Sequence, residues 1–90
     1  LLVDDNEQGL LARKTILEEL GYAVTTVSDP THAVRIFRAG DYSLVVTDFK
    51  MPQMSGPELI RELRLSSPEI PTILISGFVD ALGLNEDNTG

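Results

Sequence analysis

The sequence predicts an α/β fold in which helices cover both faces of one parallel sheet. Short apolar segments that are typical of strands alternate along the chain with amphipathic segments that are typical of helices. Strands that alternate with helices form βαβ units, and the right-handed crossover of such units makes all strands parallel. A chain of 90 residues, 42% of them hydrophobic, can build one core, so residues 1–90 are expected to form one domain.

Four segments are expected to be strands because they are short and rich in apolar or β-branched side chains. They are residues 1–3, 22–27, 44–46 and 71–75. The third segment ends at Thr47 and Asp48, and Ser76 and Gly77 close the fourth. Ligands of open parallel sheets gather outside the carboxyl ends of the strands. We therefore expect the residues after the first, third and fourth strands to converge on one edge.

Three segments are expected to be amphipathic helices, namely residues 7–20, residues 30–40 and a segment that begins at Pro57. Caps for the first two helices can come from Asp4-Asp5-Asn6 and from Ser28-Asp29-Pro30, and Gly21 is expected to end the first helix because glycine tolerates a positive φ. The side chains expected to face the core are Leu10, Ile16, Leu17 and Leu20 on the first helix, Ala33, Ile36 and Phe37 on the second, and Leu59, Ile60 and Leu63 on the third.

Three carboxylates are expected at the functional edge of the sheet. Asp4 and Asp5 alone could simply cap a helix, but Asp48 follows three apolar residues, where an ionised side chain is costly without a partner. Two unit charges about 4 Å apart repel by roughly 4 kcal/mol at an effective dielectric constant of 20, so three carboxylates together favour a bound cation. Oxygen ligands suit Mg²⁺, which also accepts a phosphoryl oxygen as a ligand.

Three motifs, in the matching order and spacing, resemble the receiver (response regulator) domain family of two-component phosphorelay signalling. They are Leu-Leu-Val-Asp-Asp-Asn at residues 1–6, Val-Val-Thr-Asp-Phe-Lys-Met-Pro at residues 45–52 with Ser55-Gly56 after it, and Ile-Leu-Ile-Ser-Gly-Phe at residues 73–78. The resemblance implies a flavodoxin-like, doubly wound parallel sheet with strand order 2-1-3-4(-5). The family's fifth strand and fifth helix are missing from this chain. Because the sequence starts without Met, we expect an excerpt of a longer protein, cut at both ends.

The same resemblance implies a role for each site residue. Asp48 would be the phosphoacceptor and a metal ligand. Asp5 would bind Mg²⁺ directly, Asp4 directly or through water, and Lys50 through its backbone carbonyl. Ser76 would be the hydroxyl that moves toward the phosphoryl group. The implied function is to take a phosphoryl group from a phosphohistidine on a sensor histidine kinase or a phosphotransfer protein and to signal by a change of conformation. Such a domain assists its own phosphorylation and dephosphorylation but is not expected to be an enzyme.

Composition narrows the expected partners and location. With 14 acidic and 7 basic residues, the formal charge of −7 argues against a direct grip on nucleic acid. The chain has no cysteine and no apolar run of bilayer length, so we expect a cytoplasmic segment without membrane contact. We expect the parent to be a hybrid sensor histidine kinase, with a stand-alone response regulator that has a separate output domain as the alternative. Without a fifth strand, the edge of the fourth is expected to allow self-association.

Three rival functions explain less of the sequence. A phosphatase that forms a phosphoaspartate needs a second aspartate two residues after the nucleophile, where Lys50 stands. A receiver-like module that is not phosphorylated would lack one of the carboxylates, and a flavodoxin-like nucleotide binder would need a phosphate loop where Asp4 and Asp5 repel phosphate. His32 is expected to be a solvated surface residue. Lys50 and Phe78 either tune the lifetime of the phosphoryl group or are neutral rim residues.

Overall fold

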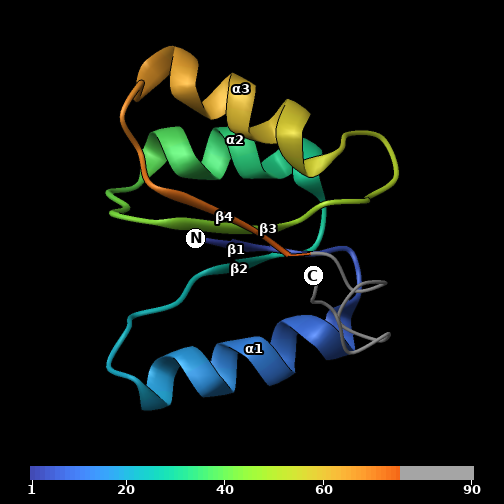
Figure 1. Cartoon of the computed structure of the whole chain (residues 1–90), viewed down its shortest axis with the longest axis vertical. Coiled ribbons are helices and arrows are strands. Elements are labelled where there is room, and N and C mark those ends of the chain that lie inside the picture. The colour runs from blue at the N-terminus through green and yellow to red at the C-terminus, as the bar shows by residue number, and fades with distance from the viewer. Residues whose placement is uncertain (76–90) are drawn as a thin grey trace, which may run out of the picture.

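The computed structural model describes residues 1–75, so Ser76 and Phe78 lie outside the described residues. In chain order the elements are β1 (Leu2–Val3), α1 (Glu7–Glu19), β2 (Thr26–Val27), α2 (Pro30–Ala39), β3 (Val45–Asp48), α3 (Gly56–Ser66) and β4 (Thr72–Ile75). The strands form one parallel sheet in the order β2-β1-β3-β4. Helices α2 and α3 cover one face and α1 covers the other (Figure 1). The predicted fold class and strand order are confirmed.

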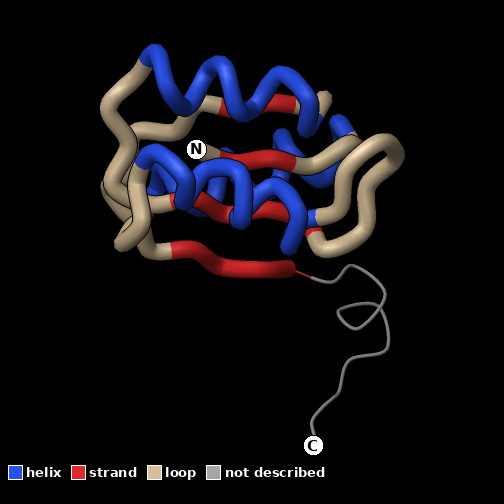
Figure 2. The backbone as a smooth tube through the Cα atoms, turned by 90° about the horizontal axis from the view of Figure 1, so that it is seen from above, coloured by secondary structure: helices blue, strands red, loops and turns tan. Residues whose placement is uncertain are grey.

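The alternation of side chains along β1 and β3 divides the core between the two faces of the sheet. Val3 and Val45 belong to the larger cluster, which α2 and α3 complete with Ala33, Phe37, Leu59 and Leu63. Leu2 and Val46 point the other way and form a smaller cluster with Leu10 of α1. Seen from above, the strands run side by side, so their carboxyl ends meet at one edge of the sheet (Figure 2).

Each helix begins at a cap that the sequence supplies. The side chain of Asn6 accepts hydrogen bonds from the backbone N–H groups of Gln8 and Gly9, and that of Asp29 accepts one from Thr31. Ser55 caps α3 in a capping box with Glu58, so this helix begins at Gly56, one residue before the predicted start. Gly21, directly after the C-cap of α1, has a φ of 100°, as predicted for the residue that ends this helix.

Two details of the prediction are wrong. The second strand was predicted over residues 22–27, but β2 contains only Thr26–Val27, because it pairs only with β1, whose two residues offer two partner positions. On α1, Ile16 and Leu20 are 57% and 69% exposed. At about 100° per residue, Leu10 and Leu17 lie on one stripe toward the sheet, and Ile16 falls well outside it.

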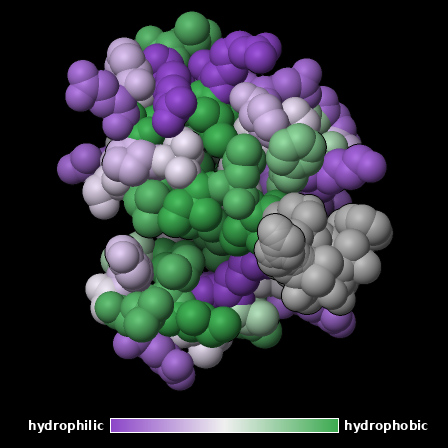
Figure 3. Space-filling view, viewed as in Figure 1, coloured by the Kyte–Doolittle hydropathy of each residue, from purple (hydrophilic) through white to green (hydrophobic). Residues whose placement is uncertain are grey.

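β4 forms the edge of the sheet that is visible at the front of Figure 1. Its Ile73 and Leu74 are 49% and 44% exposed, and Figure 3 shows hydrophobic side chains across the middle of this face. Within residues 1–75, no strand pairs with the side of β4 that faces away from β3. None of the helices in this part of the chain is long and apolar enough to cross a bilayer.

Candidate functional site

Asp4, Asp5 and Asp48 lie together at the carboxyl edge of the sheet. Asp4 and Asp5 follow β1, Asp48 is the last residue of β3, and the pairing of Val3 with Thr47 brings the two strand ends side by side. One carboxylate oxygen from each aspartate lies within 4.8 Å of the other two. Asp4 is buried, Asp48 is half-buried and Asp5 is exposed. The predicted convergence of the three carboxylates is therefore observed.

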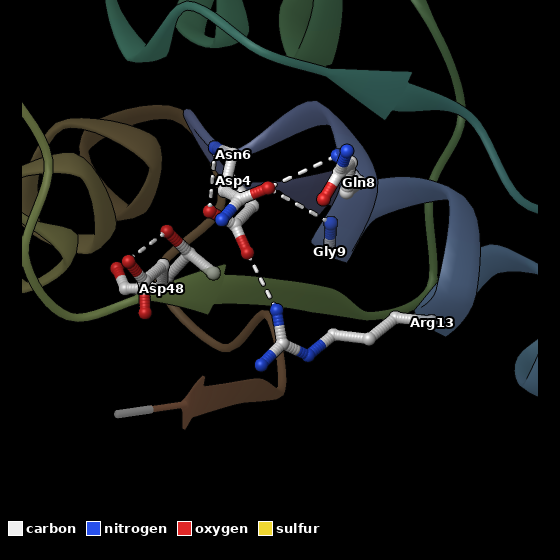
Figure 4. Close-up of polar contacts among 7 residues, drawn as sticks. Asp4, Asn6, Gln8, Gly9, Arg13 and Asp48 are labelled. Carbon is white, nitrogen blue, oxygen red and sulfur yellow. Dashed lines mark hydrogen bonds and ion pairs between the residues drawn. The ribbon is translucent and has the colours of Figure 1, made fainter. Parts of the chain in front are cut away.

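Both carboxylate oxygens of the buried Asp4 accept hydrogen bonds. Oδ1 accepts one from the backbone N–H of Asn6 at 2.9 Å, and Oδ2 accepts one from Nη1 of Arg13 at 2.5 Å. Figure 4 shows the guanidinium group reaching from α1 to the carboxylate, beside Gly9. Asp4 thus combines a turn that leads into α1 with a charged contact to the second turn of that helix.

The surroundings of Asp48, namely its burial and the other two carboxylates, raise the pKa of its carboxyl group. Burial raises the pKa of its carboxyl group, and the negative charges of Asp4 and Asp5 raise it further. The positive charge of Arg13 and the backbone N–H of Phe49 act in the opposite direction. A cation among the three carboxylates would relieve this repulsion.

The backbone behind Asp48 is held from two sides. On one side, the N–H of Phe49 donates to the carbonyl of Ile75, the residue of β4 that pairs with Asp48. On the other side, the N–H of Gly56 donates to the carbonyl of Phe49 at 2.8 Å, which fixes the first turn of α3 beside the strand end. The fully buried Thr47 donates its hydroxyl to the carbonyl of Asp48 at 3.1 Å. The backbone around Asp48 is therefore tied by hydrogen bonds to both β4 and α3.

Three further residues were considered in the sequence analysis, namely Lys50, Ser76 and His32. Lys50 is exposed in the loop that leaves β3, two residues after Asp48. Ser76 lies outside the described residues, directly after Ile75 in the sequence. His32 is exposed, as predicted, and its Nε2 lies 3.7 Å from Oδ2 of Asp29.

Arg13 is the member of the site that sequence reasoning missed. It was not singled out from the sequence, yet it lies between Leu10 and Leu17, on the stripe that faces the sheet. A long basic residue that interrupts an apolar stripe next to an acidic strand end was the available signal. Gly9 was also missed, although a glycine in the middle of a helix needs a local reason.

The donor set fits a hard divalent cation. All three converging side chains are carboxylates, and ions such as Mg²⁺ prefer oxygen ligands, often only one or two carboxylates with waters and a phosphate. The cluster also opens to solvent on the side of Asp5, which leaves room for such further ligands.

The parallel sheet with acidic residues at its carboxyl edge is the architecture of the flavodoxin-like receiver class, and sequence comparison shows the same family. Residues 1–84 match the response regulator receiver domain family. The chain belongs to this family and is a receiver domain of two-component signalling.

Individual relatives agree with this assignment. The response regulator receiver protein CpdR of Brucella abortus is 35% identical over 88 residues, which are 98% of this chain and 72% of that protein. The sensor kinase CckA of the same organism is 35% identical over 82 residues, which are 89% of this chain but 9% of the kinase. The chain therefore corresponds to a small part of such kinases and to most of a small regulator.

Solved structures show the same fold. The response regulator TrrA of Thermotoga maritima, in complex with Mg²⁺ and BeF, matches with a TM-score of 0.82 at 30% identity, over 91% of this chain and 71% of that one. The complex of the histidine kinase ThkA with TrrA also matches, with a TM-score of 0.80 at 28% identity, over 99% of this chain and 72% of that one.

Proposed function

We propose that the chain accepts a phosphoryl group on Asp48 from a phosphohistidine of a sensor histidine kinase or a histidine phosphotransfer protein. The observation that carries this proposal is the carboxylate of Asp48 at the end of β3, half-buried and within 4.8 Å of those of Asp4 and Asp5. A nucleophile in such a position is fixed in space and open to solvent on one side. The match to TrrA in complex with a kinase supports the class of partner.

The transfer requires one bond to form and one to break. A carboxylate oxygen of Asp48 forms a bond to phosphorus while the bond from phosphorus to the imidazole nitrogen breaks, and the electron pair of that bond stays on the imidazole. The negative charge of Asp4 and Asp5 would repel the incoming phosphoryl group. A divalent metal ion, when bound, neutralises this charge and that of the phosphoryl oxygens.

We assign the metal site to Asp4, Asp5 and Asp48, with the backbone carbonyl of Lys50 as a further ligand and Mg²⁺ as the ion. The oxygen-only donor set supports this assignment, and TrrA was crystallised in complex with Mg²⁺ and BeF. Ser76 is proposed to be the hydroxyl that moves toward the phosphoryl group. Its place in the sequence, one residue after the strand partner of Asp48, supports this role.

The phosphoacceptor is tested by labelling. A small acyl phosphate donor with Mg²⁺ should add one base-labile phosphoryl group, and Asp48→Asn should abolish the labelling. Asp41→Asn is the matched control because Asp41 is an exposed aspartate in the loop before β3. Undiminished labelling of Asp48→Asn would show that another residue is the acceptor.

The metal site is tested by thermal melts. Millimolar Mg²⁺ should raise the melting temperature of the protein by mass action, and Asp5→Ala should remove most of that increase. Asp5 is exposed, so its truncation costs little packing and the variant should fold. A melting temperature that does not depend on Mg²⁺ would contradict the shared metal site.

The parent protein is proposed to be a hybrid sensor histidine kinase. The receiver domain described by this chain is proposed to lie in the cytoplasm. The match to CckA supports the hybrid kinase, while CpdR represents the alternative of a regulator without a kinase. The full open reading frame distinguishes the two, because a hybrid kinase requires a kinase core before the receiver domain.

A further inference from the structure

The contact between Arg13 and Asp4 places a positive charge of the protein inside the acidic cluster. Nη1 of Arg13 lies 2.5 Å from Oδ2 of Asp4, and the two side chains are 26% and 5% exposed. An ion pair with so little solvent around it is screened weakly, and breaking it leaves a buried carboxylate without its partner. This pair therefore differs from the exposed pair between Lys14 and Glu18 on the same helix, which is 3.4 Å long.

Gly9 of α1 leaves room for the contact between Arg13 and Asp4. A β-carbon on Gly9 would lie 3.1 Å from Nη1 of Arg13 and 3.1 Å from Oδ2 of Asp4, closer than a side chain normally packs. Glycine inside a helix is less favourable than alanine, so its presence calls for a local reason. The two atoms that a side chain at position 9 would crowd are the two atoms of the ion pair, and this supplies that reason.

Asp4 cannot keep all of its present partners and also bind a metal ion freely. Oδ1 already accepts a hydrogen bond from the N–H of Asn6, and Oδ2 is the atom that Arg13 contacts. A cation that approached Oδ2 would meet the positive charge of the guanidinium group at close range. A metal ion bound at Oδ2 and the Arg13 contact would therefore compete for the same oxygen.

We infer that Arg13 is a built-in counterion that holds Asp4 while the cluster lacks a metal ion and withdraws from Oδ2 when the metal binds. Arg13 is thus a positioning residue that lowers the affinity for metal and stabilises the metal-free protein. This inference rests on the proposed metal site at Asp4, Asp5 and Asp48. The inference gives Arg13 the role of setting the metal concentration above which the domain can accept a phosphoryl group.

The test compares Arg13→Gln with Lys14→Gln, because each substitution removes one positive charge from neighbouring positions of α1. Mg²⁺ affinity is measured by titration calorimetry on the protein and both variants. Arg13→Gln should tighten Mg²⁺ binding roughly fivefold or more relative to Lys14→Gln, the scale expected when a competing contact is removed. Arg13→Gln should also lower the melting temperature without metal, and the deficit should shrink in saturating Mg²⁺.

The possible results separate this inference from the proposed function. If the unaltered protein binds Mg²⁺ and the two variants bind it equally well, or Arg13→Gln binds it more weakly, the counterion role is wrong while the metal site stands. If no variant binds Mg²⁺, the metal site and the counterion role both fall. If Arg13→Gln folds poorly without metal, Arg13→Met keeps the aliphatic packing of the side chain and must show the same gain in affinity.

Discussion

The α-carbon of Gly56 packs directly against the backbone carbonyl of Asp48. A β-carbon at position 56 would overlap that carbonyl oxygen and also press on the side chain of Leu74 in β4. The first turn of α3 can therefore approach the end of β3 only because residue 56 has no side chain.

We expect Gly56→Ala to destabilise the protein by about 1–3 kcal/mol, because the clash is with backbone that cannot move aside. Gly40→Ala is the matched control. Its β-carbon would meet the ring of Tyr42, which is a half-buried side chain and not backbone, so the cost should be smaller. Urea unfolding of both variants measures the difference, and an equal cost would show that the contact with Asp48 does not limit position 56.

Asp48→Asn should stabilise the metal-free protein near neutral pH, by less than about 1 kcal/mol because solvent screens the repulsion at this half-buried position. The pKa of Asp48 is raised in the folded state, so its ionised form is less favourable there than in the unfolded chain. The gain should be complete above the raised pKa and should fade as the pH falls through it, until it is lost below the ordinary value of 3.8, where both states are protonated. Denaturant unfolding in a chelating buffer at several pH values, with Asp41→Asn as the control, gives the profile. A gain that does not change with pH would exclude a charge effect.

Gly9→Ala should stabilise the protein less than a helical glycine-to-alanine change normally does, which is about 1 kcal/mol. The reason is the crowding of the new β-carbon against Arg13 and Asp4. In an Arg13→Gln background the crowding is relieved, so the same change should be more favourable by roughly 0.5 kcal/mol or more. A double-mutant cycle of unfolding free energies measures this coupling. Additive effects would mean that position 9 and the ion pair are independent.

The edge of β4 is predicted to mediate self-association of the 90-residue chain at raised concentration. Ile73 is 49% exposed on a strand that pairs with β3 only, within the described residues, and an unpaired apolar edge invites another chain. Ile73→Lys should shift the protein toward monomer in sedimentation equilibrium. Leu65→Lys, which adds the same charge at a 70% exposed position of α3, should not. A monomeric unaltered chain at all concentrations would contradict the prediction.

The sequence was sufficient for the parts of the site that depend on strand order. Asp4, Asp5 and Asp48 each follow an apolar strand, and parallel strands bring such positions to one edge, so their meeting could be predicted. Helical spacing places Arg13 on the stripe that faces the sheet, but it does not predict the contact with Asp4. Its contact depends on a long side chain that runs back along α1 and on the missing side chain of Gly9.

The errors in the fold have a similar origin. Ile16 and Leu20 were assigned to the core because they are apolar at nearly helical spacing, yet Leu10 and Leu17 already fill the narrow stripe that faces a sheet of short strands. The length of β2 was set by its partner β1 and not by the β-propensity of residues 22–25. In both cases, packing or pairing with the neighbouring element overrides the preference of the local sequence.

The hydrogen bond from the Phe49 N–H to the Ile75 carbonyl, 2.7 Å long, gives the site an internal spectroscopic probe. This single amide follows Asp48 in the chain and makes the last hydrogen bond between β3 and β4 within residues 1–75. Its proton resonance should therefore respond to a change of charge on Asp48 and to any shift of β4 at the same time. Slow exchange of this proton with solvent deuterium would mean that the two strand ends open together, whereas exchange faster than that of the other amides in β3 would mean that the segment after Asp48 can loosen while the rest of the strand stays paired.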